Sequence, residues 1–492
     1  MTDADSTADA VAADTHEAER TDPSPLTIGA AAAALRDGSL TSLDLTRACL
    51  AAADRLDPTL GTWLARFDES ALTRAARADE ELAAGHDLGP LHGIPLGIKD
   101  ILRTDEGPTT AQSLVLDPSW GDGGDAPVVA RLRAAGAVIV GKTTTMEFAI
   151  GRPDTTKPFP VPCNPWNPER WTGGSSSGTG NGVASGQILG GLGTDTAGSV
   201  RLPAAYNGIT GHKPTFGLVP KSGCVPLGLS YDHVGPMTRS AADAAAMLDV
   251  MAGPDASDRT TVPRPPARFA DVVERGGPTG RGLDGLRIGR LVNPELLDSC
   301  DTATLAAFDE AIEQLAAGGV DVVEVVVPHY RKLSTGAFLA LQAEAFAWHR
   351  RHLVERWDDY GRPTRLTIAQ GALISAGDLV QIERVRHLAR ARVLDLLDGD
   401  GIDLLASPTT GWAATPFSGA RPEAIATAAL HTPAWNSTGF PAVSVPMGAD
   451  DDGLPLGLQL IGRPLADGLV LAAADGYQTR TDWHRQRPPL HR

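Results

Sequence analysis

The sequence holds few of the residues that build metal centres, disulfide frameworks and surfaces for polyanions. Only four of its 492 residues are cysteine, and none form a CxxC pair, which argues against a zinc site or a disulfide framework and favours a reducing cytoplasm. The net charge of −17 argues against nucleic acid or an anionic membrane as a partner. No run of eighteen apolar residues occurs, so we expect no membrane-spanning helix.

Lysine is also scarce, because six of the 43 basic residues are lysine and the rest are arginine. Residues 1–24 hold seven acidic residues against one arginine and almost nothing apolar. We therefore expect a disordered acidic tail there, and not a signal peptide, which needs a basic start and an apolar run. A hydrophobic content of 42% is typical of an ordinary globular protein with a large core.

Short apolar runs alternate with helical patterns along much of the chain. We expect strands at 95–98, 137–140, 286–289, 320–327, 404–407, 442–445 and 457–461. Helical patterns cover 43–55, 71–84, 302–317 and most of 334–397, with Ser42 and Ser70 as predicted caps of the first two. This alternation predicts an α/β protein whose sheet is covered by helices on both faces.

The stretch from Gly173 to Asn207 reads as an active site. It holds two glycine-flanked serine sites, Ser175-Ser176-Ser177 and Ser199, separated by a segment at 183–192 that is apolar enough to be buried. Glycine allows the backbone to approach a reacting atom, and serine supplies a hydroxyl that can attack or relay a proton. A flexible Gly/Ser linker would not contain such apolar residues.

Two familiar motifs occur in the sequence, but the strands predicted around them do not fit the structure that each motif requires. Residues 136–143, GAVIVGKT, satisfy the phosphate-binding pattern G-x-x-x-x-G-K-T, but their variable positions form the predicted strand itself. Residues 174–178 match the G-x-S-x-G elbow of α/β-hydrolases, although the preceding residues make a poor strand. An esterase that uses Ser176, with Asp403 and His431 as acid and base, therefore stays open as an alternative.

Four motifs in order resemble the amidase signature family of Ser–cis-Ser–Lys hydrolases, which includes bacterial amidases and the A subunit of glutamyl-tRNA(Gln) amidotransferase. They are GPLHGIPLGIKD (89–100), GGSSSGTG…GLGTDTAGSVRLPA (173–204), SYDHVGPMTRS (230–240) and PLGLQLIG (455–462). The resemblance implies one catalytic domain over 25–492, with a single large mixed β-sheet sandwiched by helices. It also implies a catalytic triad of Lys99, Ser175 and Ser199.

The resemblance further implies how these residues act. Ser199 attacks the carbonyl, Ser175 joined through a cis peptide relays the proton, and Lys99 accepts it because burial lowers the pKa of a lysine. The backbone around Thr196, Ala197 and Gly198 is expected to form the oxyanion hole. Ser176 and a paired Asp195 and Arg201 are expected to support the site. No metal or cofactor is required.

One departure from the family lies beside the nucleophile. The family usually has Gly-Gly-Ser where this chain has Ala197-Gly198-Ser199. A methyl group at 197 demands a negative φ and narrows the site, so we expect catalysis to survive and substrate shape to change.

We expect a cytoplasmic amidase that cleaves the C–N bond of small neutral molecules, either linear amides or carbamates (a urethanase). Related esters, cleaved at the acyl C–O bond, are further candidate substrates. Proline and aromatic residues at 148–168 and around Trp412 and Trp435 suggest an apolar acyl or aryl pocket. The alternative is the glutaminase subunit of a tRNA-dependent amidotransferase, for which no acid–base pair that would grip glutamine is evident. A homodimer is compatible with either function.

Overall fold

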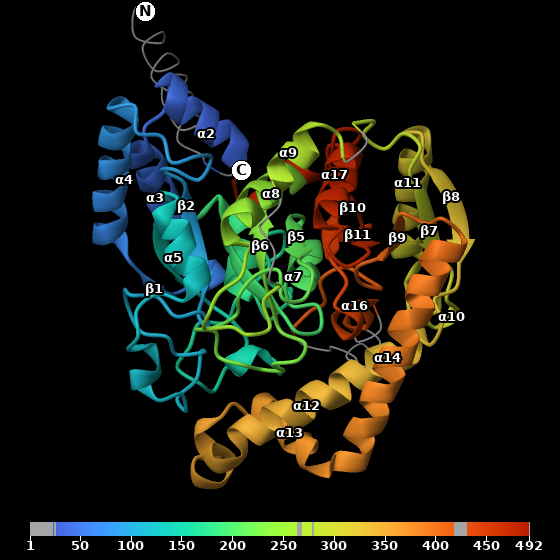
Figure 1. Ribbon diagram of the computed structural model, residues 1–492. Coiled ribbons are helices and arrows are strands. Elements are labelled where there is room, and N and C mark those ends of the chain that lie inside the picture. Colours follow the sequence, from blue (N-terminus) through green and yellow to red (C-terminus); the bar gives the residue numbers. More distant parts are fainter. Residues whose placement is uncertain (1–22, 24–25, 263–267, 278–279, 418–430, 492) are drawn as a thin grey trace, which may run out of the picture.

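The computed structural model describes residues 23, 26–262, 268–277, 280–417 and 431–491. Apart from Pro23, the predicted acidic tail lies outside these residues. The described chain forms one mixed sheet of eleven strands, ordered β1-β3-β2-β4-β6-β5-β10-β11-β9-β7-β8 (Figure 1). The predicted α/β fold with a single large mixed sheet is therefore confirmed.

The sheet is parallel at two places and antiparallel elsewhere. β2 pairs in parallel with β3 and β4, and β7 pairs in parallel with β8 and β9. The strands are β1 (Trp63–Arg66), β2 (Pro95–Lys99), β3 (Val138–Thr143), β4 (Gly190–Asp195), β5 (Thr210–Lys213), β6 (His233–Thr238), β7 (Arg287–Leu291), β8 (Asp321–Val325), β9 (Leu404–Pro408), β10 (Ala442–Ala449) and β11 (Pro455–Gly462).

Helices cover both faces of the sheet. They are α2 (Ile28–Asp37), α3 (Ser42–Leu60), α4 (Asp68–Ala83), α5 (Pro127–Ala134), α6 (Ser177–Ala184), α7 (Arg201–Asn207), α8 (Ala241–Met251), α9 (Phe269–Glu274), α10 (Pro294–Leu297), α11 (Thr302–Ala317), α12 (Tyr330–Glu355), α13 (Arg362–Ala369), α14 (Ala376–Gly399), α16 (Pro433–Thr438) and α17 (Asp467–Gln478). Short 3₁₀ turns lie at η1 (Pro118–Gly121), η2 (Glu147–Ala149), η3 (Trp357–Asp359), η4 (Gln370–Leu373), η5 (Trp483–Arg485) and η6 (Pro489–His491).

Glycines in the central strands let α6 and α7 lie close to one face of the sheet. A Cβ on Gly191 would lie 2.8 Å from Thr179 of α6, and one on Gly211 would lie 2.7 Å from Ala204 of α7. The next residue of β5, His212, faces the other way and contacts Asp467 of α17 at 3.2 Å. Glycine in a strand permits such close approach, so the sequence brings both serine-bearing segments down onto the central strands.

Two predicted helix caps are wrong by a few residues. Thr41, not Ser42, caps α3 by accepting from Asp44 N–H, and α4 begins at Asp68 with no side-chain cap. Ser70 lies inside the first turn of α4, where its hydroxyl donates to the carbonyl of Phe67. More than one residue that can cap a helix lies near the start of α3 and near the start of α4, so the backbone geometry decides which of them is the cap.

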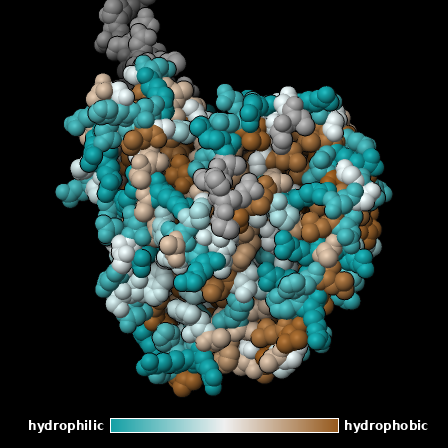
Figure 2. Space-filling view, in the orientation of Figure 1, coloured by the Kyte–Doolittle hydropathy of each residue, from teal (hydrophilic) through white to brown (hydrophobic). Residues whose placement is uncertain are grey.

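An arm of three helices, α12, α13 and α14, lies along one end of the molecule (Figure 1). Hydrophobic side chains gather in separate patches on the face shown in Figure 2, among more numerous hydrophilic ones. Several large apolar side chains of the arm are exposed, namely Leu339, Val354, Leu366, Val380 and Leu388, and so is Leu373 of η4, between α13 and α14. Within the described residues, no helix is both long enough and apolar enough to cross a membrane.

Candidate active site

Lys99 is the last residue of β2 and is fully buried. Its Nζ lies 2.7 Å from Ser175 Oγ and 2.7 Å from Thr194 Oγ1 of β4, and donates a hydrogen bond to each. β2 and β4 are neighbouring parallel strands, so Lys99 and Thr194 extend from the same edge of the sheet. The structure thus joins Lys99 to Ser175, as expected for a proton relay.

Burial lowers the pKa of Lys99 from 10.5 to about 7. Desolvation disfavours the ammonium form, and the nearby acidic groups of Cys224, Asp195 and Asp232 only partly oppose it. At neutral pH a large share of the Lys99 side chains is therefore unprotonated. Lys99 can then act as a base.

Ser175 and Ser199 lie in two loops that touch each other. The peptide between Gly174 and Ser175 is cis. The backbone N–H of Ser176 donates to the carbonyl of Ser199 at 3.2 Å. Ser175 is buried and Ser199 is half-buried, so the loop of Ser199 is the more accessible one.

The turn before Ser199 is held by a buried ion pair. Arg201 Nε lies 2.9 Å from Asp195 Oδ2, and both side chains are fully buried. Asp195 also accepts hydrogen bonds from the backbone N–H groups of Gly198 (2.7 Å) and Val200 (3.3 Å). Burial alone would raise the pKa of Asp195, but the charge and hydrogen bonds of Arg201 hold it well below its usual range. The predicted pairing of Asp195 with Arg201 is confirmed.

The backbone N–H groups of the predicted oxyanion hole are not equivalent. The N–H of Gly198 is engaged by Asp195, whereas those of Thr196, Ala197 and Ser199 donate no hydrogen bond to any part of the chain that the structure describes. Ala197 has a negative φ, as the sequence predicts, while Gly198 has a φ of 126°. A Cβ at 198 would lie 2.2 Å from Thr432 Oγ1, so only glycine fits there.

A cavity of about 410 Å³ opens at Ser199. Ser199, Gly174 and the 196–198 segment line it, whereas Lys99 and Ser175 do not. Its other walls are mostly apolar, from Met146, Ala149, Ile150, Trp171, Leu202, Tyr206, Leu227, Phe338, Leu341, Pro363, Leu366 and Trp412. Trp412 lines the cavity as expected, but Trp435 does not, because it is fully buried in the core.

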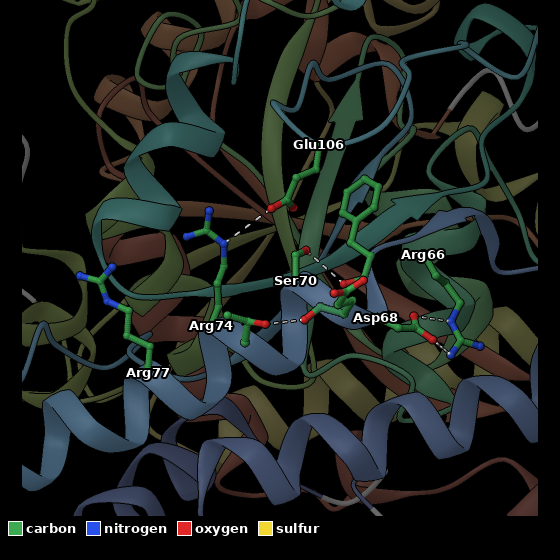
Figure 3. A pocket seen from close by; sticks show the side chains of 9 residues that line it. Arg66, Asp68, Ser70, Arg74, Arg77 and Glu106 are labelled. Atoms are coloured by element: carbon green, nitrogen blue, oxygen red, sulfur yellow. Dashed lines mark hydrogen bonds and ion pairs between the residues drawn. The ribbon is translucent and has the colours of Figure 1, made fainter.

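A second and larger hollow, of about 690 Å³, lies at β1 and α4. Its lining is charged, and Figure 3 shows Arg66 and Arg74 paired with carboxylates. The third arginine, Arg77, is paired with Glu81. Arg66 binds Asp68 at 2.5 Å, and Arg74 lies 3.7 Å from Glu106. None of Lys99, Ser175 and Ser199 lines this hollow, so it is separate from the reaction site.

The structure assembles neither of the two other motifs. Ser176 Oγ donates to the carbonyl of Thr194 and accepts from its N–H, and no strand precedes it within 161–176. His431 contacts Ser299, whereas Asp403 accepts from Arg287 N–H, so the acid–base pair of an elbow-type esterase does not form. The GAVIVGKT segment falls mainly in β3, as expected.

Sequence reasoning missed several residues that hold the site together. Thr194 is the second partner of Lys99, and buried Asp232 accepts from Thr196 Oγ1 at 2.5 Å. Asn436 donates to both the carboxylate and the carbonyl of Asp195. Thr194 is next to the predicted Asp195, and Asp232 lies in the SYDHVGPMTRS motif, so proximity and motif could have found them. Asn436 carries no such signal.

Among the residues that the structure describes, no group of three or more His, Cys, Asp or Glu is placed to hold a metal ion. The sequence matches the amidase family over residues 44–471. The chain belongs to the amidase signature family. It is thereby a hydrolase of the class that acts on carbon–nitrogen bonds.

Relatives of two kinds cover nearly the whole chain. The A subunit of the glutamyl-tRNA(Gln) amidotransferase from Chloroflexus aurantiacus is 38% identical, over 94% of this chain and 98% of that protein. A Mycobacterium tuberculosis protein with the provisional name amidase AmiD is 37% identical, over 93% and 94% of the two chains. The solved peptide amidase of Stenotrophomonas maltophilia has a TM-score of 0.80 and 31% identity, over 94% and 98%. Family membership is clear, and the substrate differs among the relatives.

Proposed function

We propose that this chain works alone as an amidase on small-molecule amides or carbamates with an apolar acyl portion, through an acyl-enzyme on Ser199. The observation that carries the proposal is that Ser199 lines the apolar cavity while Lys99 and Ser175, joined by a 2.7 Å hydrogen bond, lie buried behind it. This arrangement supports a nucleophile that faces the substrate and a base that is shielded from water.

Proton transfers in the proposed mechanism run along Lys99, Ser175 and Ser199. Neutral Lys99 takes the proton of Ser175 as Ser175 takes that of Ser199, and Ser199 Oγ bonds to the carbonyl carbon. The tetrahedral intermediate expels the amine, which receives the proton back through Ser175, and leaves acyl-Ser199. Water, deprotonated by the same route, then releases the acid. A carbamate follows the same steps through a carbamoyl-serine.

The free backbone N–H groups of Thr196, Ala197 and Ser199 are the donors that we propose for the oxyanion, with Gly198 fixing the turn through Asp195. One such donor is worth about 10²- to 10³-fold in rate. Asp232 holds the Thr196 side chain and Asn436 holds Asp195, so the donors are fixed before the substrate arrives. Such preorganisation avoids the cost of reordering dipoles during the reaction.

The test is the reaction of the purified chain with a fluorophosphonate and with a nitroanilide panel. We expect mass spectrometry to find the adduct on Ser199, and Ser199→Ala to lose at least ~10³-fold in rate. Ser222→Ala is the matched control, because the Ser222 hydroxyl binds that of Ser257 at the surface. An adduct on Ser176, or an active Ser199→Ala, would overturn the assignment.

A second candidate function is that of the amidotransferase subunit, favoured by the 38% identity to the Chloroflexus protein. Free glutamine carries an ammonium group, and no acidic side chain lines the cavity among the described residues. An unpaired ammonium in such a site is costly, which favours the stand-alone amidase. Steady-state rates on a nitroanilide, an aryl carbamate and glutamine decide between them. Glutamine as the best substrate, or activity only with an added partner, would favour the amidotransferase subunit.

A further inference from the structure

One charged side chain interrupts the apolar wall of the reaction cavity. Arg152 is the only charged residue among the described residues that line it, and it is half-buried. A guanidinium presents five N–H donors and stays charged at any physiological pH. A purely apolar substrate would leave these donors unused.

Arg152 has no partner among the residues that the structure describes. It makes no hydrogen bond and no ion pair with any residue that the structure describes, although Asp154 is nearby in sequence and accepts from Arg362 N–H instead. In the charged hollow at β1 and α4, by contrast, Arg66 is paired with Asp68 (Figure 3). Leaving a charged donor without a partner in a confined site is unfavourable, so a ligand that pairs with Arg152 should be favoured. Such a ligand would not first have to break a contact between Arg152 and another described residue.

The segment from Met146 to Arg152 forms part of the cavity wall and leads away from the catalytic serines. Its first residue, Met146, lies against the serine loop, since a Cβ on Gly174 would lie 2.9 Å from the Met146 side chain. At its other end, a Cβ on Gly151 would lie 2.8 Å from Thr364 of α13. Arg152 is also near enough to Tyr206 for its charge to oppose the rise that burial causes in the Tyr206 pKa. Tyr206 lies five residues beyond the first residue of α7, Arg201, roughly 8 Å along the helix.

We infer that Arg152 selects amides whose acyl portion is an apolar chain ending in a carboxylate, such as the half-amides of dicarboxylic acids. This inference rests on the proposed function. The acyl group stays bound to Ser199 while the amine leaves, so the acyl group is the part that the cavity must hold. Arg152 binds the terminal carboxylate through a charge-assisted pair, and the apolar walls between Arg152 and Ser199 contact the chain.

The overall negative charge does not oppose this selection at close range. At physiological ionic strength the interaction between exposed charges is largely screened beyond about 8 Å. No carboxylate lies on the lining of the cavity described above. Arg152 also borders a small neighbouring hollow that Glu147, Asp154 and Lys157 line, but on the side of the reaction cavity it is the only charged group that a bound acyl carboxylate meets among the described residues. This replaces the expectation of a wholly neutral substrate with a substrate that has an apolar middle and an anionic end.

The test compares the mono-p-nitroanilide of adipic acid with the p-nitroanilide of adipamic acid, which has the same length and a neutral amide end. We expect the wild type to prefer the acid in kcat/KM. Arg152→Gln should lower kcat/KM for the acid by about 10- to 100-fold, the range of a charge-assisted hydrogen bond, and change the amide by less than about 3-fold. Arg152→Lys should recover part of the loss. Arg74→Gln, in the separate charged hollow, is the control and should keep the wild-type preference.

Equal rates of the wild type on both anilides, or equal losses on both in Arg152→Gln, would overturn the inference and leave the amidase proposal intact. For N-hexanoyl-4-aminobenzoate, which has its carboxylate on the leaving group, kcat/KM should not change in Arg152→Gln. A large loss on this substrate would refute the placement of Arg152 on the acyl side.

Protection from labelling tests the same contact without turnover. Adipate, but not adipamide, should slow fluorophosphonate labelling of Ser199, and Arg152→Gln should abolish that protection. If Ser199 is not labelled at all, the amidase proposal fails first.

Discussion

Replacing Lys99 by methionine should abolish catalysis and yet stabilise the fold at neutral pH. The pKa of Lys99 falls from 10.5 to about 7, and each unit is worth roughly 1.4 kcal/mol. The buried amine therefore costs the folded state about 5 kcal/mol well below pH 7, and about 4 kcal/mol at pH 7, where roughly half of it is already neutral. Methionine has a similar shape and no charge to bury, so it avoids this cost.

Two hydrogen bonds oppose the gain. Lys99 Nζ donates to Ser175 and Thr194 at 2.7 Å each, and their loss costs roughly 1 kcal/mol apiece. We therefore expect Lys99→Met to raise the free energy of unfolding by about 2–3 kcal/mol at pH 7, from these two opposing terms.

The stability advantage of Lys99→Met should fall as the pH rises. Because the folded pKa of Lys99 lies below the unfolded one, the unfolded chain binds an extra proton between pH 7 and 10.5. Wild-type stability from this group thus rises with pH in that window, and the advantage of Lys99→Met shrinks by roughly 1.4 kcal/mol per pH unit. It should vanish near pH 9.

The assay is urea unfolding of wild type and Lys99→Met at pH 6, 7, 8 and 9, compared at a common slope. Lys332→Met is the control, because Lys332 is exposed and stays in water in both states. A variant that is less stable than wild type at pH 7, or a difference that does not change with pH, would refute the reasoning.

Further predictions concern the rate and the shape of the site. The kcat/KM of the wild type should rise with pH through about 7 as Lys99 loses its proton, whereas Lys99→Ala should lack that step and regain some activity only where hydroxide is abundant; an unchanged profile would remove Lys99 from the relay. Asp195→Asn leaves the buried Arg201 without its counter-charge, so we expect a loss of roughly 3–5 kcal/mol in stability by urea titration and a lower kcat. Ala197→Gly removes a methyl from the cavity wall and should raise kcat/KM for bulkier acyl groups relative to small ones in a homologous anilide series. EDTA should leave all these rates unchanged, and inhibition reversed by zinc would show that the mechanism is incomplete.

A feature of the fold could be predicted from the sequence when neighbouring residues alone indicate it. Lys99 at the end of β2 was predictable, because PLGIK is a short apolar run that closes on a charge. β4 was not identified as a strand, because three of its six residues are glycine and carry no hydrophobic pattern. β4 is a strand because it pairs with β2 and β6, and its glycines allow α6 to lie close. No local sequence pattern reveals these long-range contacts.

Distant partners escaped prediction for a related reason. The pair of Asp195 and Arg201 is six residues apart and was predictable, but Asn436, which donates to Asp195, is 241 residues away in sequence. Aromatic residues show the same limit, since Trp412 lines the cavity and Trp435 lies in the core. Composition identifies both as apolar but does not tell which way each side chain faces.

The placement of the lysines has a practical consequence for chemical modification. Lys99, Lys142 and Lys213 are fully buried and Lys221 nearly so, which leaves Lys157 and Lys332 within reach of solvent. An amine-reactive ester should therefore attach to very few side chains of the native protein, and unfolding should expose four more acylation sites. Lysine-directed coupling to a solid support would then hold the enzyme at one of two places, through Lys332 at the start of α12 or through Lys157, which donates to the carbonyl of Asp358 just beyond the end of α12. The amount of label taken up would report the fraction of unfolded molecules.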